Sequence, residues 1–198
     1  MDNSQFQLLN WISQLKRNQA PHIYKQMVVL DYARTYRSLA LIETGTYLGD
    51  MIEAMTNYFE LIVSIELSPQ LYSKAVKKFN NIKKINLFLG DSGSLLPNVL
   101  NHITFGCVFW LDGHFSEGIT AKSDINTPII KELNAILNHD IKDHVILIDD
   151  ARLFNGTNDY PTIREIEDKL EGKDYVLEIR NDIIRITPKL ASSENYLL

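Results

Sequence analysis

The sequence predicts an α/β protein with a doubly wound sheet of seven strands, and three observations lead to this prediction. From residue 39 onward, short apolar runs alternate with helical patterns in five strand-helix units. Runs such as residues 145–148 are apolar on both faces, as expected when helices cover both sides of a parallel sheet. The last two runs are separated only by Asn181 and Asp182. A parallel crossover needs more residues, so the mostly parallel sheet must end in an antiparallel hairpin.

Each element follows from its own pattern. Residues 4–16 and 21–37 have the apolar spacing of amphipathic helices, and Pro21 suits the start of the second one. Apolar runs of strand length follow at residues 39–44, 61–66, 85–90, 107–112, 144–149, 175–180 and 183–187. Helical patterns lie between them at residues 50–58, 69–79, 92–101, 127–138 and 161–170. We therefore expect two extra N-terminal helices over residues 1–38, which could act as a lid, and one domain over residues 39–198.

Composition and charge restrict the class of protein. A chain of 198 residues can bury the core of one domain, and no apolar run is long enough to cross a bilayer. The net charge of −5 gives no electrostatic footprint for nucleic acid. The N-terminus lacks the basic and apolar regions of a secretion signal, and the lone Cys107 lies in an apolar run. We expect a cytoplasmic protein with a small-molecule partner and no nucleic acid or membrane partner. The sequence is also compatible with a homo-oligomer.

A glycine-containing turn follows the first predicted strand. In Rossmann-like sheets ligands bind at the carboxyl ends of the strands. Gly45 permits a tight turn and Gly49 lets the next helix start close to it, so backbone N–H groups between them, such as that of Thr46, can face a ligand. The alternative is an ordinary strand-to-helix loop. Tyr47 and Asp50 stand where the dinucleotide fingerprint needs glycines, which disfavours a nicotinamide cofactor.

Acidic residues end the next two predicted strands. Glu66 lies 21 residues after Gly45, where a carboxylate can accept hydrogen bonds from both hydroxyls of a ribose. Its alternative role is a favourable charge near the start of the helix at Pro69. Asp91, followed by Ser92, could accept from an adenine amino group or could cap the next helix.

Together, Glu43-x-Gly45-x-x-x-Gly49, Glu66 and Gly90-Asp91 resemble the nucleotide-side motifs of class I S-adenosylmethionine-dependent methyltransferases, over residues 39–188. The chain departs from the commoner motif at Tyr47, which stands in place of a middle glycine. The resemblance implies S-adenosylmethionine as cofactor. It assigns cofactor contacts to Glu43, Gly45, Thr46, Gly49, Glu66, Asp91 and Ser92.

The fourth and fifth predicted strands also end in carboxylates. Leu-Asp-Gly-His at residues 111–114 and Leu-Ile-Asp-Asp-Ala at residues 147–151 look like the metal-binding strand ends of magnesium-dependent O-methyltransferases of the macrocin type, which act on sugar hydroxyls. This resemblance implies Mg²⁺ or Mn²⁺ held by Asp112, Asp149 and Asp150. If the two strands are neighbours, their carboxylates would converge and repel unless a cation offset the charge. The alternative is that Asp149 or Asp150 caps a turn or pairs with Arg152.

His114, two residues after Asp112, is the candidate general base, and Asp112 the other candidate catalytic residue. The alternative for His114 is an exposed loop histidine. The segment from residue 113 to residue 143 is longer than expected for the macrocin type, so we expect the substrate side to differ. Residues 115–126 and 154–160 would shape the acceptor pocket.

The sequence therefore predicts a metal-dependent O-methyltransferase that modifies a sugar or another small polyhydroxylated acceptor. One alternative is a hydroxylase with a redox metal on the same fold. An all-carboxylate site lacks the two histidines typical of non-haem iron, which argues against it. Another alternative is a degenerate methyltransferase domain that only binds partners. Its sequence mark would be loss of the motif carboxylates, and these are present.

Overall fold

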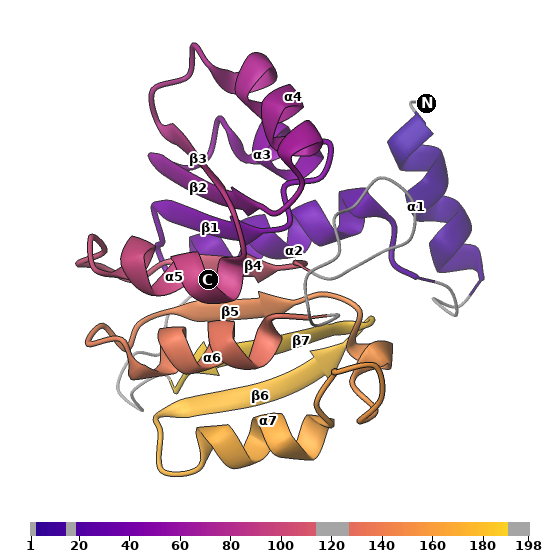
Figure 1. Ribbon diagram of the computed structural model, residues 1–198. Helices are drawn as coiled ribbons and strands as arrows, with labels where there is room; N and C mark the ends of the chain where they lie inside the picture. The colour runs from indigo at the N-terminus through magenta and orange to yellow at the C-terminus, as the bar shows by residue number, and fades with distance from the viewer. Residues whose placement is uncertain (1–2, 15–18, 114–126, 190–198) are drawn as a thin grey trace.

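A computed structural model describes residues 3–14, 19–113 and 127–189 of the chain. It contains a seven-stranded sheet in the order β3-β2-β1-β4-β5-β7-β6 (Figure 1). The strands are β1 (Ala40–Thr44), β2 (Leu61–Glu66), β3 (Ile85–Leu89), β4 (Val108–Leu111), β5 (Val145–Ile148), β6 (Tyr175–Arg180) and β7 (Ile183–Pro188). Strands β1 to β5 pair in parallel, whereas β7 pairs antiparallel with both β5 and β6. The predicted fold class is confirmed.

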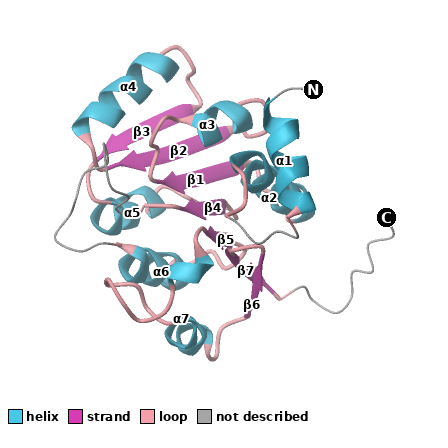
Figure 2. Ribbon diagram, turned by 90° about the vertical axis from the view of Figure 1, so that its right-hand side faces the viewer, coloured by secondary structure: helices cyan, strands magenta, loops and turns pink. Residues whose placement is uncertain are grey.

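Helices cover both faces of the sheet (Figure 2). The helices are α1 (Asn3–Ser13), α2 (His22–Thr35), α3 (Asp50–Met55), α4 (Pro69–Phe79), α5 (Ser92–Leu100), α6 (Ile129–Asn138) and α7 (Ile163–Leu170), with the short 3-10 helix η1 (Ala151–Leu153). Apolar side chains of α5, α6 and α7 pack on one face of the sheet, and those of α2, α3 and α4 pack on the other. The result is a three-layer α/β/α arrangement.

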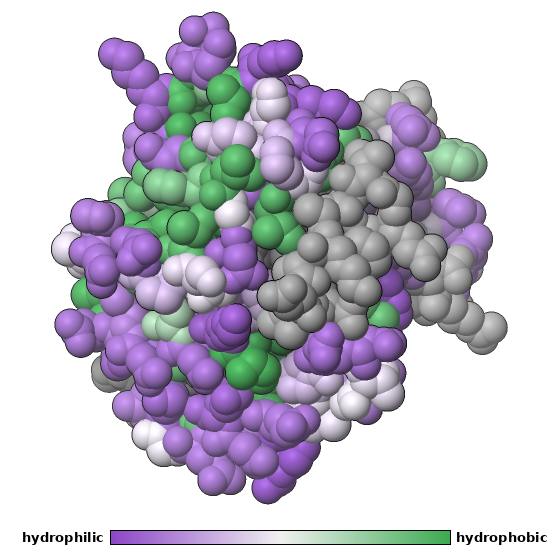
Figure 3. All heavy atoms as spheres, viewed as in Figure 1, coloured by the Kyte–Doolittle hydropathy of each residue, from purple (hydrophilic) through white to green (hydrophobic). Residues whose placement is uncertain are grey.

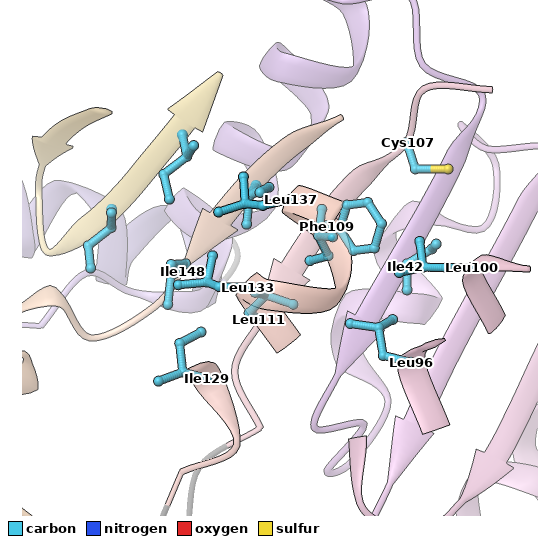
Figure 4. Packing of buried hydrophobic residues seen from close by; sticks show 14 of the residues in the cluster. Ile42, Leu96, Leu100, Cys107, Phe109, Leu111, Ile129, Leu133, Leu137 and Ile148 are labelled. Carbon is cyan, nitrogen blue, oxygen red and sulfur yellow. The ribbon is translucent and has the colours of Figure 1, made fainter. Parts of the chain in front are cut away.

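The central strands are buried on both faces. Every residue of β1, β4 and β5 is buried, which explains why their sequences do not alternate between apolar and polar residues. Figure 4 shows the side of the sheet where Phe109 of β4 and Ile148 of β5 pack beside Leu133 of α6. Burial of these apolar side chains is the main source of stability for the fold.

The sheet edge formed by β3 is less covered. Phe88 and Leu89 of β3 are 41% and 45% exposed. Figure 3 shows hydrophobic residues gathered between α4 and α5, over β3, whereas hydrophilic residues predominate over α6 and α7. The buried end of β2 at Glu66 lies next to this edge, beside Leu89.

The element boundaries agree with the sequence patterns to within a few residues. One difference is α3, which ends at Met55 where the pattern predicts helix to residue 58. Beyond Met55 the amide of Tyr58 bonds back only three residues, to the carbonyl of Met55, so the chain leaves the helix through a tighter turn. The two-residue hairpin connection is as predicted, with positive φ at both Asn181 and Asp182.

The two N-terminal helices differ in how they join the fold. Val28, Val29 and Ala33 of α2 belong to the core on one face of the sheet, whereas α1 buries only Trp11. The role of residues 1–38 as a lid stays a prediction. Within the described ranges, no helix combines the length and apolar character that crossing a membrane requires.

Candidate functional site

The strand order reverses direction between β1 and β4, and in open α/β sheets ligands bind at the carboxyl ends of strands beside such a point. The glycine loop after β1 lies there. Gly45 has a φ of 85°, and a Cβ added to it would lie 2.5 Å from the carbonyl oxygen of Asp112. Gly49 has a φ of 76°, and its added Cβ would lie 2.6 Å from Cε2 of Phe79. Both positions therefore require glycine for backbone conformation and for space.

Glu66, at the end of β2, holds this loop in place. Its two carboxylate oxygens accept hydrogen bonds from the backbone N–H groups of Tyr47, at 2.9 Å, and Ser68, at 2.8 Å. Each carboxylate oxygen can accept a further bond, so the predicted contact with ribose hydroxyls is chemically compatible with these two. The side chain that caps α4 is that of Ser68, which accepts from the N–H of Leu71.

Glu43 lies beneath the glycine loop, not on its surface. Its side chain is buried in β1 and accepts a 2.6 Å hydrogen bond from the hydroxyl of Ser64, which is also 2.6 Å from that of Thr46. Burial raises the pKa of Glu43 to about 8. The chain of contacts from Glu43 through Ser64 to Thr46 thus supports the loop from the sheet side.

Asp91 and Ser92 lie at the start of α5. Asp91 is the residue before the helix, but its side chain makes no capping bond to the first turn. One of its carboxylate oxygens instead accepts from the hydroxyl of Ser94, at 2.8 Å. Ser92 is buried at the first helical position. The structure therefore does not support the alternative role of Asp91 as a side-chain cap of α5.

The three predicted metal ligands come to one place. Leu111 of β4 lies beside Ile148 of β5, so Asp112 and Asp149 follow at adjacent strand ends. Asp149 and Asp150 are both buried, and Asp112 is half-buried. Burial raises the pKa of Asp149 to about 7, and the nearby charges of Asp112 and Asp150 add to this rise while Lys25 opposes it. The expected convergence of carboxylates is present.

A lysine side chain reaches these carboxylates. Lys25 of α2 is only 7% exposed, and its Nζ forms an ion pair with Oδ2 of Asp149. Burial disfavours the charged form of Lys25, but the charge of Asp149, joined by Asp112 and Asp150, outweighs it, so the pKa of Lys25 lies above its usual value.

Asp150 also has protein partners. Its Oδ1 accepts from Nε2 of Gln19, at 3.0 Å, and from Nη1 of Arg152, at 2.7 Å. Arg152 forms a second ion pair with Asp182 in the β6–β7 hairpin. The pairing of Asp150 with Arg152, considered as an alternative from the sequence, is thus observed.

These arrangements do not fit a divalent ion. Among residues 3–14, 19–113 and 127–189, no three His, Cys, Asp or Glu side chains are arranged to hold one. The magnesium or manganese site at Asp112, Asp149 and Asp150 stays a prediction. His114, the predicted general base, lies outside the described residues, as do residues 115–126 of the predicted acceptor pocket.

Sequence patterns did not single out two further side chains beside this site, Lys25 and Glu132, whereas Tyr160 lies in the predicted pocket segment 154–160. Glu132 of α6 is 1% exposed, and burial raises its pKa to about 7. Its Oε1 has no hydrogen-bond partner within the described ranges. Tyr160 and Glu132 help to line a small cavity of about 10 Å³ beside Asp149 and Gly113. A charged residue on the apolar face of a helix, as at Lys25 and Glu132, is a signal that the sequence did contain.

Solved structures with a similar fold include O-methyltransferases. TomG of Streptomyces achromogenes, an enzyme of tomaymycin synthesis solved in complex with S-adenosylmethionine, aligns over 95% of this chain and 90% of its own, with a TM-score of 0.63 and 14% identity. The chain has the methyltransferase fold. An O-methyltransferase of Bacillus cereus solved with S-adenosylhomocysteine aligns over 96% of this chain and 92% of its own, with a TM-score of 0.63 and 13% identity.

PaMTH1, a methyltransferase of Podospora anserina bound to S-adenosylhomocysteine, has a TM-score of 0.59 and 15% identity over 96% of this chain and 89% of its own. No protein-family model matches the chain, and no curated protein matches it in sequence. At these identities the likeness establishes the fold, and the chemistry has to be argued from the site.

Proposed function

We propose that the protein is an S-adenosylmethionine-dependent O-methyltransferase that methylates a hydroxyl of a sugar or another small polyhydroxylated molecule. The observation that carries this proposal is the glycine loop at the switch point, followed by acidic residues at the next two strand ends. Backbone N–H groups and carboxylates in this order match the anionic and hydroxyl groups of a nucleoside-containing ligand. The likeness to TomG and to the Bacillus cereus enzyme supports it.

The residues around the loop fit the methyl donor. Glu66 has acceptor capacity left for ribose hydroxyls, and Asp91 can accept from an adenine amino group. The close approach of Gly45 to Asp112 leaves no room for a side chain between the two strand ends. The bound donor would supply a methyl group on a positively charged sulfur, which is already a good leaving group.

The protein's task is then to align the acceptor and remove its proton. The bond from the acceptor oxygen to the methyl carbon forms as the bond from that carbon to sulfur breaks, and the electron pair of the broken bond stays on sulfur. The acceptor proton passes to a base, for which we propose His114, with Asp112 orienting the hydroxyl.

The sequence also predicts Mg²⁺ or Mn²⁺ for this reaction. Because Asp149 is paired with Lys25, and Asp150 with Gln19 and Arg152, the described side chains do not offer a ligand set for that ion. The proposed chemistry therefore contains no step at a metal, and a metal-dependent form of the reaction is the alternative that chelation tests.

The first prediction is that S-adenosylmethionine binds to the parent protein and that Glu66→Ala weakens binding. Loss of hydrogen bonds to a charged acceptor costs roughly 1.5–3 kcal/mol, about ten- to a hundred-fold in affinity. Calorimetric titration with S-adenosylmethionine and S-adenosylhomocysteine measures this. Glu178→Ala, which removes an exposed carboxylate on the edge strand β6, is the matched control.

Absence of binding to the parent protein would overturn the proposed function. Equal affinity in the Glu66→Ala and Glu178→Ala variants would remove Glu66 from the site. Because Glu66 also holds the loop, a thermal melt of each variant separates lost contacts from lost structure. Methyl transfer from labelled donor to a panel of sugars then tests the acceptor class.

A further inference from the structure

We propose that Lys25 supplies the cation of this site: its ammonium group takes the place of a divalent ion among Asp112, Asp149 and Asp150, so that the site works without a metal. This inference rests on the proposed function, since it concerns how the same site would bind its acceptor. It contradicts the metal requirement that the sequence predicts.

The position of Lys25 is fixed by the fold. It belongs to α2, whose Val28 and Val29 are buried against the sheet, so the helix is anchored one turn further along. From there its Nζ reaches Asp149, 124 positions away in the sequence. Lys25 is 7% exposed and its partner Asp149 is 4% exposed, so the two form a buried ion pair within the site and not a surface ion pair.

The carboxylate oxygens of Asp149 and Asp150 already accept hydrogen bonds from other groups of the protein, and a metal ion would compete with these groups. Oδ1 of Asp149 accepts from the N–H of Asp150, at 2.9 Å, while its Oδ2 pairs with Lys25. Oδ1 of Asp150 accepts from Gln19 and Arg152. Mg²⁺ demands oxygen ligands in near-ideal octahedral geometry at about 2.0–2.1 Å. Its binding to Oδ2 of Asp149 would require Lys25 to leave, and its binding to Oδ1 of Asp150 would compete with Gln19 and Arg152.

The ammonium group of Lys25 supplies a positive charge among the carboxylates, as a divalent ion would. It carries three N–H donors in addition to its charge, and one of them is used by Asp149. The others can donate to the acceptor oxygen and stabilise the negative charge that develops as its proton leaves. In this arrangement Lys25 binds the acceptor, and α2, from outside the predicted core domain, completes the active site.

The same geometry predicts what happens when the lysine is removed. Lys25→Met would leave Asp149 buried with nothing to balance its charge, next to Asp112 and Asp150. Such a cluster should recruit a divalent ion from solution. Removal of the cation should therefore create a metal site that the parent protein lacks.

The experiment is a titration of the full chain with Mn²⁺, followed by electron paramagnetic resonance, for the parent, Lys25→Met and Lys142→Met proteins. Lys142 is a matched lysine at the opposite end of β5, where it donates to the carbonyl oxygens of Leu137 and His139. We expect saturable one-to-one binding of Mn²⁺ to Lys25→Met, at least about tenfold tighter than any binding to the other two proteins. Tight binding to the parent that is lost in Asp149→Asn would overturn the proposal.

If Lys25→Met does not fold alone, refolding it with and without Mn²⁺ gives the same information, since an ion that replaces the lysine should rescue it. The double variant Lys25→Met/Asp149→Asn, which removes both charges, should fold and should not bind Mn²⁺. Rescue of Lys25→Met by this second substitution but not by Mn²⁺ would also overturn the proposal.

A separate calorimetric titration with S-adenosylmethionine keeps the two proposals apart. If the parent binds neither the methyl donor nor Mn²⁺, the proposed function fails while the role of Lys25 as resident cation stands. If the parent binds both, the function stands and the role of Lys25 fails.

Discussion

The chemistry of single carboxyl groups in this site is set by burial more than by pairing. Glu43, Glu132 and Asp149 all have a raised pKa, and burial is the largest cause for each. Among them Glu43 is buried within β1, where its carboxylate accepts a hydrogen bond from the hydroxyl of Ser64. It therefore allows a clean test of how burial couples protonation to folding.

The second prediction is that Glu43→Gln removes a loss of stability at neutral pH. The pKa of Glu43 is raised from 4.5 to about 8, so the folded state keeps a proton that the unfolded state has released. The stabilising effect of that proton is complete below pH 4.5 and is lost as the pH rises toward 8. Relative to Glu43→Gln, the parent should lose on the order of 2–4 kcal/mol of unfolding free energy across this window.

Urea unfolding at a series of pH values measures this difference. The contributions of Glu132 and Asp149 are common to both proteins and cancel. Glu178→Gln, at an exposed position of β6, should instead parallel the parent at every pH. Parallel curves for the parent and Glu43→Gln would show that Glu43 is ionised in the folded protein.

The position of three carboxylates at strand ends could be predicted from the sequence, but their partners could not. The strand ends locate Glu66, Asp112 and Asp149 because hydrophobic runs end abruptly there, and this is a local pattern. The partner of Asp149 is Lys25, whose side chain arrives from a helix far away in the sequence. The local sequence does not distinguish a carboxylate that binds a metal ion from one that pairs with a lysine.

At the scale of elements, the loop between β1 and α3 and the end of β4 are packed against each other through backbone atoms. The N–H of Asp112 donates to the carbonyl of Thr44, at 3.1 Å, and Gly45 lies against the carbonyl of Asp112. The sequence indicates that glycine is needed for the turn, but the close approach to β4 follows only from the strand order. The position of the loop is therefore a tertiary property.

The third prediction is that Gly45→Ala is much more destabilising than Gly172→Ala. Both glycines have positive φ, 85° and 73°, so both substitutions carry a backbone cost of about 1–2 kcal/mol. Only at Gly45 would the new Cβ meet backbone atoms, since nothing lies within 4 Å of the one at Gly172. The clash should add roughly 1–3 kcal/mol.

Denaturant midpoints of the two variants give the comparison, with Gly172→Ala as the internal reference for the backbone term. Equal losses of stability would mean that the loop moves away from β4 at little cost. In that event Gly45→Ala should still bind S-adenosylmethionine, whereas a loop fixed against β4 predicts weakened binding.

At the scale of the whole molecule, the two N-terminal helices differ in how they pack against the sheet. The sequence places both N-terminal helices outside the domain because they precede the first strand. In the structure α2 shares a hydrophobic cluster with β1, β4 and β5, and it carries Lys25 into the site. The helix α1, by contrast, leaves Phe6, Leu9 and Ile12 exposed. Which helix joins the core depends on contacts across the sheet, which periodicity alone does not contain.

The fourth prediction is that α2 unfolds with the sheet while α1 opens locally. Trp11, packed against Tyr24 with ring centroids 4.7 Å apart, is the single buried anchor of α1, whereas Val29 of α2 is completely buried in the core. Val29→Ala should lower the global unfolding free energy by about 1–3 kcal/mol and speed hydrogen exchange in α2 and the central strands together. Trp11→Ala should speed exchange in α1 and leave the denaturant midpoint of the sheet nearly unchanged, as measured by exchange detected by mass spectrometry and by urea unfolding. If Trp11→Ala instead destabilises the sheet as much as Val29→Ala does, the two helices form one cooperative unit with the core, and α1 is not free to act as a lid.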